Sequence, residues 1–412
     1  MDYPYPKTER QAELIALADA LAGPIAARAA TVDREGVFPY QNFRELHAAG
    51  YLGITIPRTL GGLGADVLEY ALAHERIARA CGSTALAANM HCSLIGRIDE
   101  TGMWPAELLE RVNRDIVANG ALLNSANSEP DLGSPSRGGL PSTTAERTPR
   151  GWLINGRKRW ASLAPALTHM LVLATVVDGD SPPRRGNFLV PTSSPGVRVE
   201  ATWDNLGMRG TASDDVIFTG VDVPRDALVP IDGSATPGDG LGWSAFGGAA
   251  VFLGIGQAAR DAAVHYALER KPNGMAGPIA ELQTIQHRIA AIELDLLQAR
   301  TLLYTTAEWW VARPAERGAN MWRLAAAKYV VTNAVIRATD EALRVAGSAG
   351  LALTSPLQRY FRDARTAIGQ PPLEDVALTT IGKAALGLSP GGNRDGAANH
   401  DAAVPVATVR SV

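Results

Sequence analysis

The spacing of apolar residues changes twice along this chain, and that change limits the possible folds more than any other feature. From about residue 8 to residue 118, apolar residues recur at the spacing of amphipathic helices. From about residue 122 to residue 229, short β-rich runs follow one another with turn residues between them. Helical spacing returns from about residue 244 to residue 386. This order predicts a helical region, a small β-barrel or sandwich, and a second helical region.

We therefore expect an α+β multidomain protein, since 412 residues are enough for two or three cores. The expected domains are an N-terminal α-helical domain at 1–118, a middle β domain at 119–232, and a C-terminal four-helix bundle at 241–388, where four or five long helices are indicated. A Gly- and Pro-rich stretch at 232–240 forms the linker. Residues 389–412 lack periodicity, which predicts a disordered tail.

Charge and composition exclude several classes of function. The net charge is −3 and the basic residues are scattered, so the chain has no basic surface for nucleic acid. No apolar run approaches the roughly 20 residues of a membrane helix, and residues 1–7 lack a signal sequence, which together predict a cytoplasmic protein without membrane insertion. Cys81 and Cys92 are the only cysteines, and the histidines lack metal-binding spacing. We expect neither a disulfide framework nor a metal site.

Two neighbouring stretches of the middle region indicate a bound ligand. Residues 128–134 read Ser-Glu-Pro-Asp-Leu-Gly-Ser, and residues 152–162 supply strand-forming residues that end in Trp160 and Ser162. A polar, glycine-containing loop can bring backbone N–H groups and hydroxyls against a flat polar ligand. The pattern therefore suggests a cofactor. In contrast, the Gly-Ile-Gly run at 254–256 lies inside a helical pattern and does not predict a dinucleotide loop.

Short motifs follow one another through all three regions. They lie at 53–57 with 61–64, at 128–134, at 155–160, at 206–210, at 266–270 and at 362–365. In this order the motifs resemble the acyl-CoA dehydrogenase superfamily, and the resemblance covers about residues 8 to 388. It implies that family's three-domain fold and a bound FAD between the β domain and the C-terminal bundle.

The resemblance also assigns residues to the cofactor. It places Ser128, Gly133 and Ser134 in the loop that contacts the flavin ring and the pyrophosphate, with Trp160 and Ser162 near the reactive edge of the ring. From the residues alone, Trp160 has a second interpretation as a core strand residue.

Other matching positions lie in the C-terminal region. Arg270 and Gln283 match positions at which a neighbouring subunit contacts the pyrophosphate and adenosine of FAD, and Gly347 matches a further FAD-contacting turn. A site completed by a second subunit implies an oligomer, here a homodimer or a homotetramer.

The implied reaction is α,β-dehydrogenation of an acyl-CoA or another acyl thioester in fatty acid metabolism, with hydride transfer to flavin N5 and an electron-transfer flavoprotein as the acceptor. Such a reaction needs a carboxylate base. Relatives often carry Glu after the motif at 362–365, but an ungapped alignment places Pro371 there, and Ser244 stands at the second known position. The remaining candidates are Glu374 and Asp375.

Two alternatives follow from the missing base. Glu374 and Asp375 are also typical of a helix start, where carboxylates in the first turn are favourable. The protein would then be a flavin-dependent monooxygenase or oxidase on the same fold, or a flavin- or ligand-binding protein without a catalytic base. Gly369 and Gln370 offer no His of the kind that such monooxygenases frequently carry in this loop.

Overall fold

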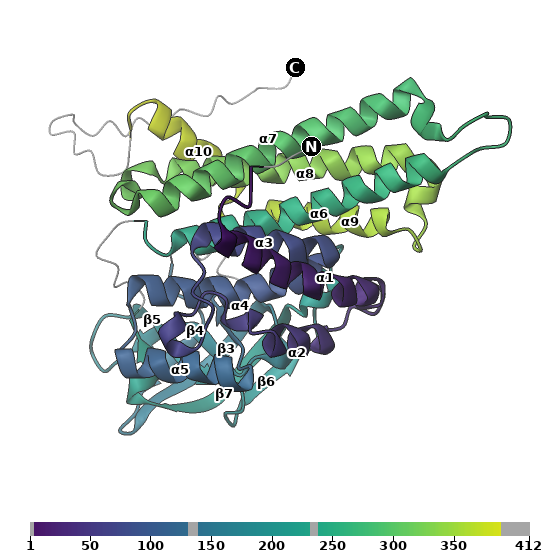
Figure 1. The fold of residues 1–412 in the computed structure, drawn as a ribbon. Coiled ribbons are helices and arrows are strands. Elements are labelled where there is room, and N and C mark those ends of the chain that lie inside the picture. Colours follow the sequence, from purple (N-terminus) through teal and green to yellow (C-terminus); the bar gives the residue numbers. More distant parts are fainter. Residues whose placement is uncertain (1–3, 131–138, 231–237, 389–412) are drawn as a thin grey trace, which may run out of the picture.

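The computed structural model describes residues 4–130, 139–230 and 238–388. Its helices and strands form three regions: a β sheet, a bundle of long helices, and a set of N-terminal helices, some of which lie between the other two regions (Figure 1). The expected order of a helical region, a middle β domain and a C-terminal helical domain is therefore confirmed. The predicted tail at 389–412 lies outside the described residues.

Five helices form the N-terminal region. They are α1 (Glu9–Glu35), α2 (Tyr40–Ala48), α3 (Val67–Ala80), α4 (Gly82–Thr101) and α5 (Ala106–Asn119). Local sequence fixes several of the ends. Thr8 accepts a hydrogen bond from the backbone of Gln11 at the start of α1, and Asp66 with Glu69 forms a capping box at the start of α3. Most residues of α3 and α4 are buried, so these helices lie in the interior of the molecule.

The middle region is an eight-stranded mixed sheet. Its strands are β1 (Leu123–Ala126), β2 (Thr144–Arg147), β3 (Gly151–Ala161), β4 (His169–Val177), β5 (Arg184–Pro191), β6 (Val197–Glu200), β7 (Asp214–Pro224) and β8 (Leu228–Val229). The pairing order is β6-β7-β3-β2-β4-β5-β8, with β1 also paired to β4. Within the described residues this path has two ends, β6 and β8, so hydrogen bonds do not close it into a barrel.

The C-terminal region contains three long helices and two shorter ones. They are α6 (Leu241–Glu269), α7 (Gln283–Ala312), α8 (Trp322–Ala346), α9 (Pro356–Arg365) and α10 (Glu374–Ala385). In Figure 1 the helices α6 to α9 lie along one side of the molecule, and the sheet lies along the other. Helix α6 packs against α8 and α7 within its own region and against α3 and α4 of the N-terminal region.

Two described helices, α1 and α6, are long and apolar enough to cross a membrane by length and composition alone. The expectation that no apolar run approaches 20 residues is wrong at α6, because residues 241–259 include no charged residue. In α6, 72% of the apolar window is buried inside the protein, against 33% in α1. Buried core helices commonly have this composition, so the two helices are weak support for a membrane span.

The Gly-Ile-Gly run of α6 has a packing role. A Cβ atom on Gly254 would lie 2.4 Å from the carbonyl oxygen of Glu75 in α3, a distance that no side chain tolerates. A Cβ atom on Gly256 would lie 2.8 Å from a methyl of Leu296 in α7. These glycines therefore let α6 approach its neighbours closely. This packing role agrees with the prediction that the run does not form a dinucleotide loop.

Candidate functional site

Four non-glycine residues among those described have a positive φ, and they lie together. The φ angles are 59° at Trp160, 65° at Leu163, 53° at Met208 and 43° at Ala212. Trp160 lies near the end of β3 and Leu163 in the loop that follows it, while the other two lie in the loop that precedes β7. L-amino acids seldom adopt this left-handed conformation, and bulky ones such as Trp and Leu least of all.

The two loops hold each other in this conformation. The backbone N–H of Leu163 donates to the carbonyl of Thr211 (3.0 Å), and the N–H of Ala164 donates to the carbonyl of Ala212 (3.3 Å). Strained backbone persists only where the surroundings fix it, and it is concentrated at ligand and active sites. We therefore take the two strained loops, residues 160–164 and 208–213, as the centre of the candidate site.

A chain of hydroxyl groups connects the strained loops. The Oγ atoms of Ser162 and Ser213 are 2.8 Å apart, and the Oγ of Ser213 is 2.8 Å from the Oγ1 of Thr211. Thr211 in turn donates to the carbonyl oxygen of Met208 (2.9 Å). The sequence identified Ser162 but missed Thr211 and Ser213, although they directly follow the motif at 206–210.

Trp160 stands out from the protein at this site. The pairing of β3 with β7 is irregular between Lys158 and Ala161, and Trp160 occupies this bulge. Its side chain is 61% exposed. The interpretation of Trp160 as a core residue is therefore wrong. A large aromatic ring held outward by strained backbone offers a flat apolar face to a ligand.

Ser128 lies beside the same strand, next to a buried ion pair. Its carbonyl accepts a hydrogen bond from the N–H of Arg159 (3.0 Å). The next residue, Glu129, is buried and lies 2.6 Å from the ammonium of Lys158, which is also buried. Glu129 accepts a further hydrogen bond from the backbone of Thr143 (3.0 Å). Gly133 and Ser134 lie outside the described residues.

The pKa values of both members of the buried pair are lowered, for different reasons. Burial opposes the charge of Glu129, but the hydrogen bonds from Lys158 and Thr143 outweigh it and hold the pKa of the carboxyl below its ordinary value. Burial lowers the pKa of the Lys158 ammonium. The pairing of Glu129 with Lys158 could not be predicted from the sequence, because the two residues are 29 positions apart.

The motif at 362–365 positions one of the strained loops. Asp363 is buried and accepts a hydrogen bond from the N–H of Met208 (2.7 Å). A Cβ atom on Gly207 would lie 2.4 Å from the carbonyl oxygen of Arg362, so the loop lies directly against α9. Burial raises the pKa of the Asp363 carboxyl to about 6. The C-terminal bundle therefore helps to shape the site of the middle domain.

The remaining residues assigned to the cofactor lie at the ends of bundle helices. Arg270 follows α6, Gln283 begins α7, and both are exposed, as a contact to a second subunit requires. Gly347 ends α8 with φ 59° and ψ −139°, and a Cβ atom there would meet nothing within 4 Å. An open glycine of this kind permits close approach of a ligand. The FAD contacts of all three residues stay predictions.

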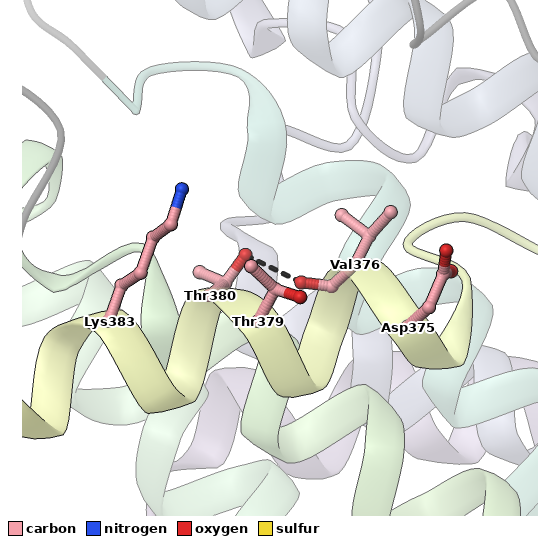
Figure 2. Close-up of a pocket in the computed structure, with 5 residues that line it drawn as sticks. All are labelled: Asp375, Val376, Thr379, Thr380 and Lys383. Carbon is pink, nitrogen blue, oxygen red and sulfur yellow. Dashed lines mark hydrogen bonds between the residues drawn. The ribbon is translucent and has the colours of Figure 1, made fainter. Parts of the chain in front are cut away.

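Glu374 and Asp375 occupy the first turn of α10. Both are exposed, and they line different hollows. Glu374 lines a small cavity of about 50 Å³ with Lys328 of α8. Asp375 lines a hollow of about 310 Å³ on the face of α10 that also carries Thr379 and Lys383 (Figure 2). The prediction that one of the two carboxylates is the base stays a prediction.

Lys328 was not identified from the sequence. Its ammonium is buried beside Glu374 and donates to the carbonyl of Ala367 (3.1 Å), in the loop that precedes α10. Burial lowers the pKa of Lys328 to about 8, although the charge of Glu374 opposes this shift. Among the described residues, no group of three His, Cys, Asp or Glu side chains is placed to hold a metal ion.

Comparison with sequence families gives three matches in chain order. Residues 8–103 match "Acyl-CoA dehydrogenase, N-terminal domain", residues 124–221 match the corresponding middle domain, and residues 246–369 match the C-terminal domain. Together these matches span most of the chain.

Individual proteins are similar over nearly the same length. The putative acyl-CoA dehydrogenase YdbM of Bacillus subtilis is 37% identical over 85% of this chain and 90% of its own length. The human mitochondrial short-chain specific acyl-CoA dehydrogenase is 32% identical over 83% of this chain and 81% of its own. The solved structure of KijD3 with FMN and a dTDP-linked amino sugar has a TM-score of 0.82 and 30% identity, and covers 94% of this chain and 96% of that one. The chain belongs to the acyl-CoA dehydrogenase superfamily.

Proposed function

We propose that this protein is an FAD-dependent oxidoreductase that oxidises the Cα–Cβ bond of an acyl thioester. The observation that carries the proposal is the pair of strained loops, which holds an exposed indole beside a chain of hydroxyls. Membership of the acyl-CoA dehydrogenase superfamily supports the choice of reaction.

The residues present fit a flavin. An isoalloxazine ring is flat and apolar on its faces, with polar atoms along its edges. Trp160 can cover a face, while Ser162 can meet an edge. Bound FAD would supply the hydride acceptor, as cofactors generally carry the difficult chemistry. The chain's own residues would orient the ring and exclude water from it.

The proposal also names a substrate, an electron acceptor, an oligomeric state and a cellular compartment. Curated relatives named as acyl-CoA dehydrogenases support an acyl-CoA substrate. An electron-transfer flavoprotein would accept the electrons, and a homodimer or homotetramer would complete the FAD site through Arg270 and Gln283. We propose that the protein acts in the cytoplasm.

The first experiment is anaerobic mixing of the FAD-loaded protein with short, medium, branched and aromatic acyl-CoA thioesters. We expect one class to bleach the oxidised flavin band. Replacing Glu374 with Gln and Asp375 with Asn, separately, then tests the base. Loss of flavin reduction in one variant, with retained FAD, would identify it. Undiminished reduction in both would remove both carboxylates from the mechanism.

A separate line of reasoning favours a second candidate function. An ungapped alignment leads us to expect the catalytic Glu of relatives at Pro371, and KijD3, of similar structure, was solved with FMN. A monooxygenase that uses externally reduced flavin would need no base for a Cα proton. It predicts substrate-dependent oxygen uptake with aromatic or heteroaromatic compounds. Flavin reduction by an acyl-CoA would exclude this candidate. Flavin binding without either activity would instead indicate a binding protein.

A further inference from the structure

A polar cavity lies where the N-terminal helices meet the C-terminal bundle. Its volume is about 230 Å³, and its lining comes from α1, α3, α6, α7 and Tyr5, which precedes α1. Among the described residues, none that lines it belongs to the strained loops or to the positions assigned to the cofactor. The cavity is smaller than the roughly 300–1,000 Å³ of sites for drug-sized ligands, so it suits a small molecule.

The lining contains one carboxylate among the described residues, that of Glu75 in α3, and both of its oxygens are engaged. Oε1 accepts a hydrogen bond from Arg300 of α7, and Oε2 accepts one from the hydroxyl of Tyr304. Glu75 is 4% exposed, and a carboxylate buried to this degree needs such partners. Because the charges of Glu75 and Arg300 offset each other, other residues set the net charge of the lining.

Two further guanidinium groups, those of Arg76 and Arg79, line the cavity from α3. Three positions separate them, so they are neighbours on one face of the helix. Arg76 lies 3.9 Å from the carboxylate of Asp19, which is beyond hydrogen-bond distance. Arg79 lies 2.5 Å from Asp261, but Asp261 is also 3.1 Å from Arg260. Neither aspartate lines the cavity, so the lining itself carries three arginines against one glutamate.

We propose that this cavity binds a small molecule with a phosphate or carboxylate group, which Arg76 and Arg79 hold. A guanidinium presents five N–H donors in a planar fork that matches the oxygens of either group. Within the described part of the chain, neither guanidinium donates a hydrogen bond, because the contact of Arg79 with Oδ2 of Asp261 lacks the required geometry. These donors are therefore directed to water or to a ligand.

The segment that precedes α1 forms a fixed wall of the cavity. The hydroxyl of Tyr5 donates to Glu308 of α7 (2.8 Å), and the Tyr5 ring lies 5.6 Å from the ring of Tyr304. The ammonium of Lys7 also lies 2.8 Å from Glu308. An anion held by α3 beside this wall and α7 would bind the folded protein alone. Binding should therefore raise the midpoint temperature of unfolding.

The test is isothermal titration calorimetry of the full-length, FAD-loaded protein with inorganic phosphate and, separately, with succinate. The bound cofactor keeps the anion from binding in its place. Sodium chloride holds the ionic strength constant, so that general screening does not change during the titration. We expect saturable binding of at least one anion, and the tighter of the two identifies the group that the cavity takes.

Two variants locate the bound anion. Arg76→Gln and Arg79→Gln, made separately, should each weaken binding at least about tenfold, because each removes a charge-assisted hydrogen bond to the anion. Arg114→Gln removes an exposed guanidinium of α5 that pairs with Glu110. It changes the net charge equally, and it should bind the anion as the wild type does.

Two results would overturn the inference. One is the absence of saturable binding of both anions to the wild type. The other is an affinity that stays at the wild-type value in both Arg76→Gln and Arg79→Gln, because the anion would then lie elsewhere. Failure to bind or reduce a flavin would overturn the proposed function alone, since the same comparison of variants can be made on the protein without cofactor.

Discussion

At the scale of single residues, the site departs from the most stable local structure. A residue in a sparsely populated backbone conformation costs about 1–3 kcal/mol. Four such residues lie in two loops that hydrogen-bond to each other. Trp160 adds an exposed indole, which buries little apolar surface in the free protein. The strain therefore lowers the stability of the free protein at this site, as expected where ligand binding offsets the cost.

The substitution Trp160→Gly tests whether the conformation of this residue lowers stability and favours flavin binding. Glycine adopts a positive φ without strain, so we expect the free energy of unfolding without cofactor to stay unchanged or to rise by about 1 kcal/mol. Flavin affinity should fall about fivefold, because a lost aromatic contact is worth about 1 kcal/mol. Urea unfolding and fluorescence titration with FAD measure the two quantities. Val177→Gly, at the end of β4 and without a positive φ, is the control and should lose stability while binding FAD normally.

The buried pair of Lys158 and Glu129 gives a second prediction. Lys158→Met leaves the Glu129 carboxylate buried without its charged partner, so we expect a loss of about 3–5 kcal/mol in the free energy of unfolding. The exposed pair of Arg150 and Asp222 supplies the control, since Arg150→Met should cause no measurable change. Equal effects of the two substitutions would contradict the argument from burial.

Residues of the site differ in how far the sequence could predict them. Trp160 could be placed near a ligand, and its exposure agrees with that role. The hydroxyl chain could not be predicted, because Ser162 meets Ser213 across 51 positions and only the fold brings them together. The buried pair was missed for the same reason. A charged residue inside a strand pattern is usually exposed, and nothing local to Lys158 indicates a partner.

At the scale of elements, α8 and α10 meet through a buried charge. Lys328 of α8 donates to the loop before α10, and its pKa is lowered to about 8 from an ordinary value of 10.5. The unfolded chain holds this proton to higher pH than the folded protein does. The contribution of Lys328 to stability therefore rises as the pH increases from about 8 toward 10.5, and it is least favourable below pH 8.

Lys328→Met removes this pH dependence. We subtract the free energy of unfolding of the wild type from that of the variant. This difference should become about 2 kcal/mol more negative between pH 7 and pH 10, because only the wild type gains stability from Lys328 as the pH rises. Urea unfolding at the two pH values measures it. Lys383→Met, which removes an exposed ammonium of α10 in the same bundle, is the control for the loss of a lysine. A flat difference for Lys328→Met would contradict the burial of a charge at this position.

Element types were easier to predict than element ends. The β-rich runs predicted for the middle region include β4 and β7, because both strands are rich in β-branched residues. The helical spacing of the C-terminal region does not show where α7 begins, which is at Gln283, after a 3₁₀ turn at Ile279–Glu281. A 3₁₀ turn and an α-helix suit the same residues, so local sequence alone does not set the first residue of α7.

At the scale of the whole molecule, the outer face of α6 and α7 is suited to a second copy of the chain. A hollow of about 330 Å³ lies there, and its lining is almost entirely apolar. Leu268 lines it and is 60% exposed. Arg270, the residue predicted to reach a neighbouring FAD, lies two positions further along. An exposed apolar hollow of this kind is typical of a protein interface.

Leu268→Glu should therefore lower the oligomeric state measured by sedimentation, because a charge would be buried at the interface. FAD retention on gel filtration should fall in parallel. Leu353→Glu is the control, since Leu353 is even more exposed, at 88%, but does not line the hollow. An unchanged oligomer in Leu268→Glu would place the interface elsewhere.

The central position of α3 and α4 affects how the chain reaches its fold during synthesis. Both helices are buried on most sides, and α6, which covers them, begins at Leu241. When the ribosome has completed α4 at Thr101, the partner surface of these helices has not yet been made. The N-terminal region must therefore wait, with apolar surface uncovered, until well over a hundred further residues have emerged. Its folding is tied to the far end of the chain, and a fragment that stops before α6 would expose the same surface permanently.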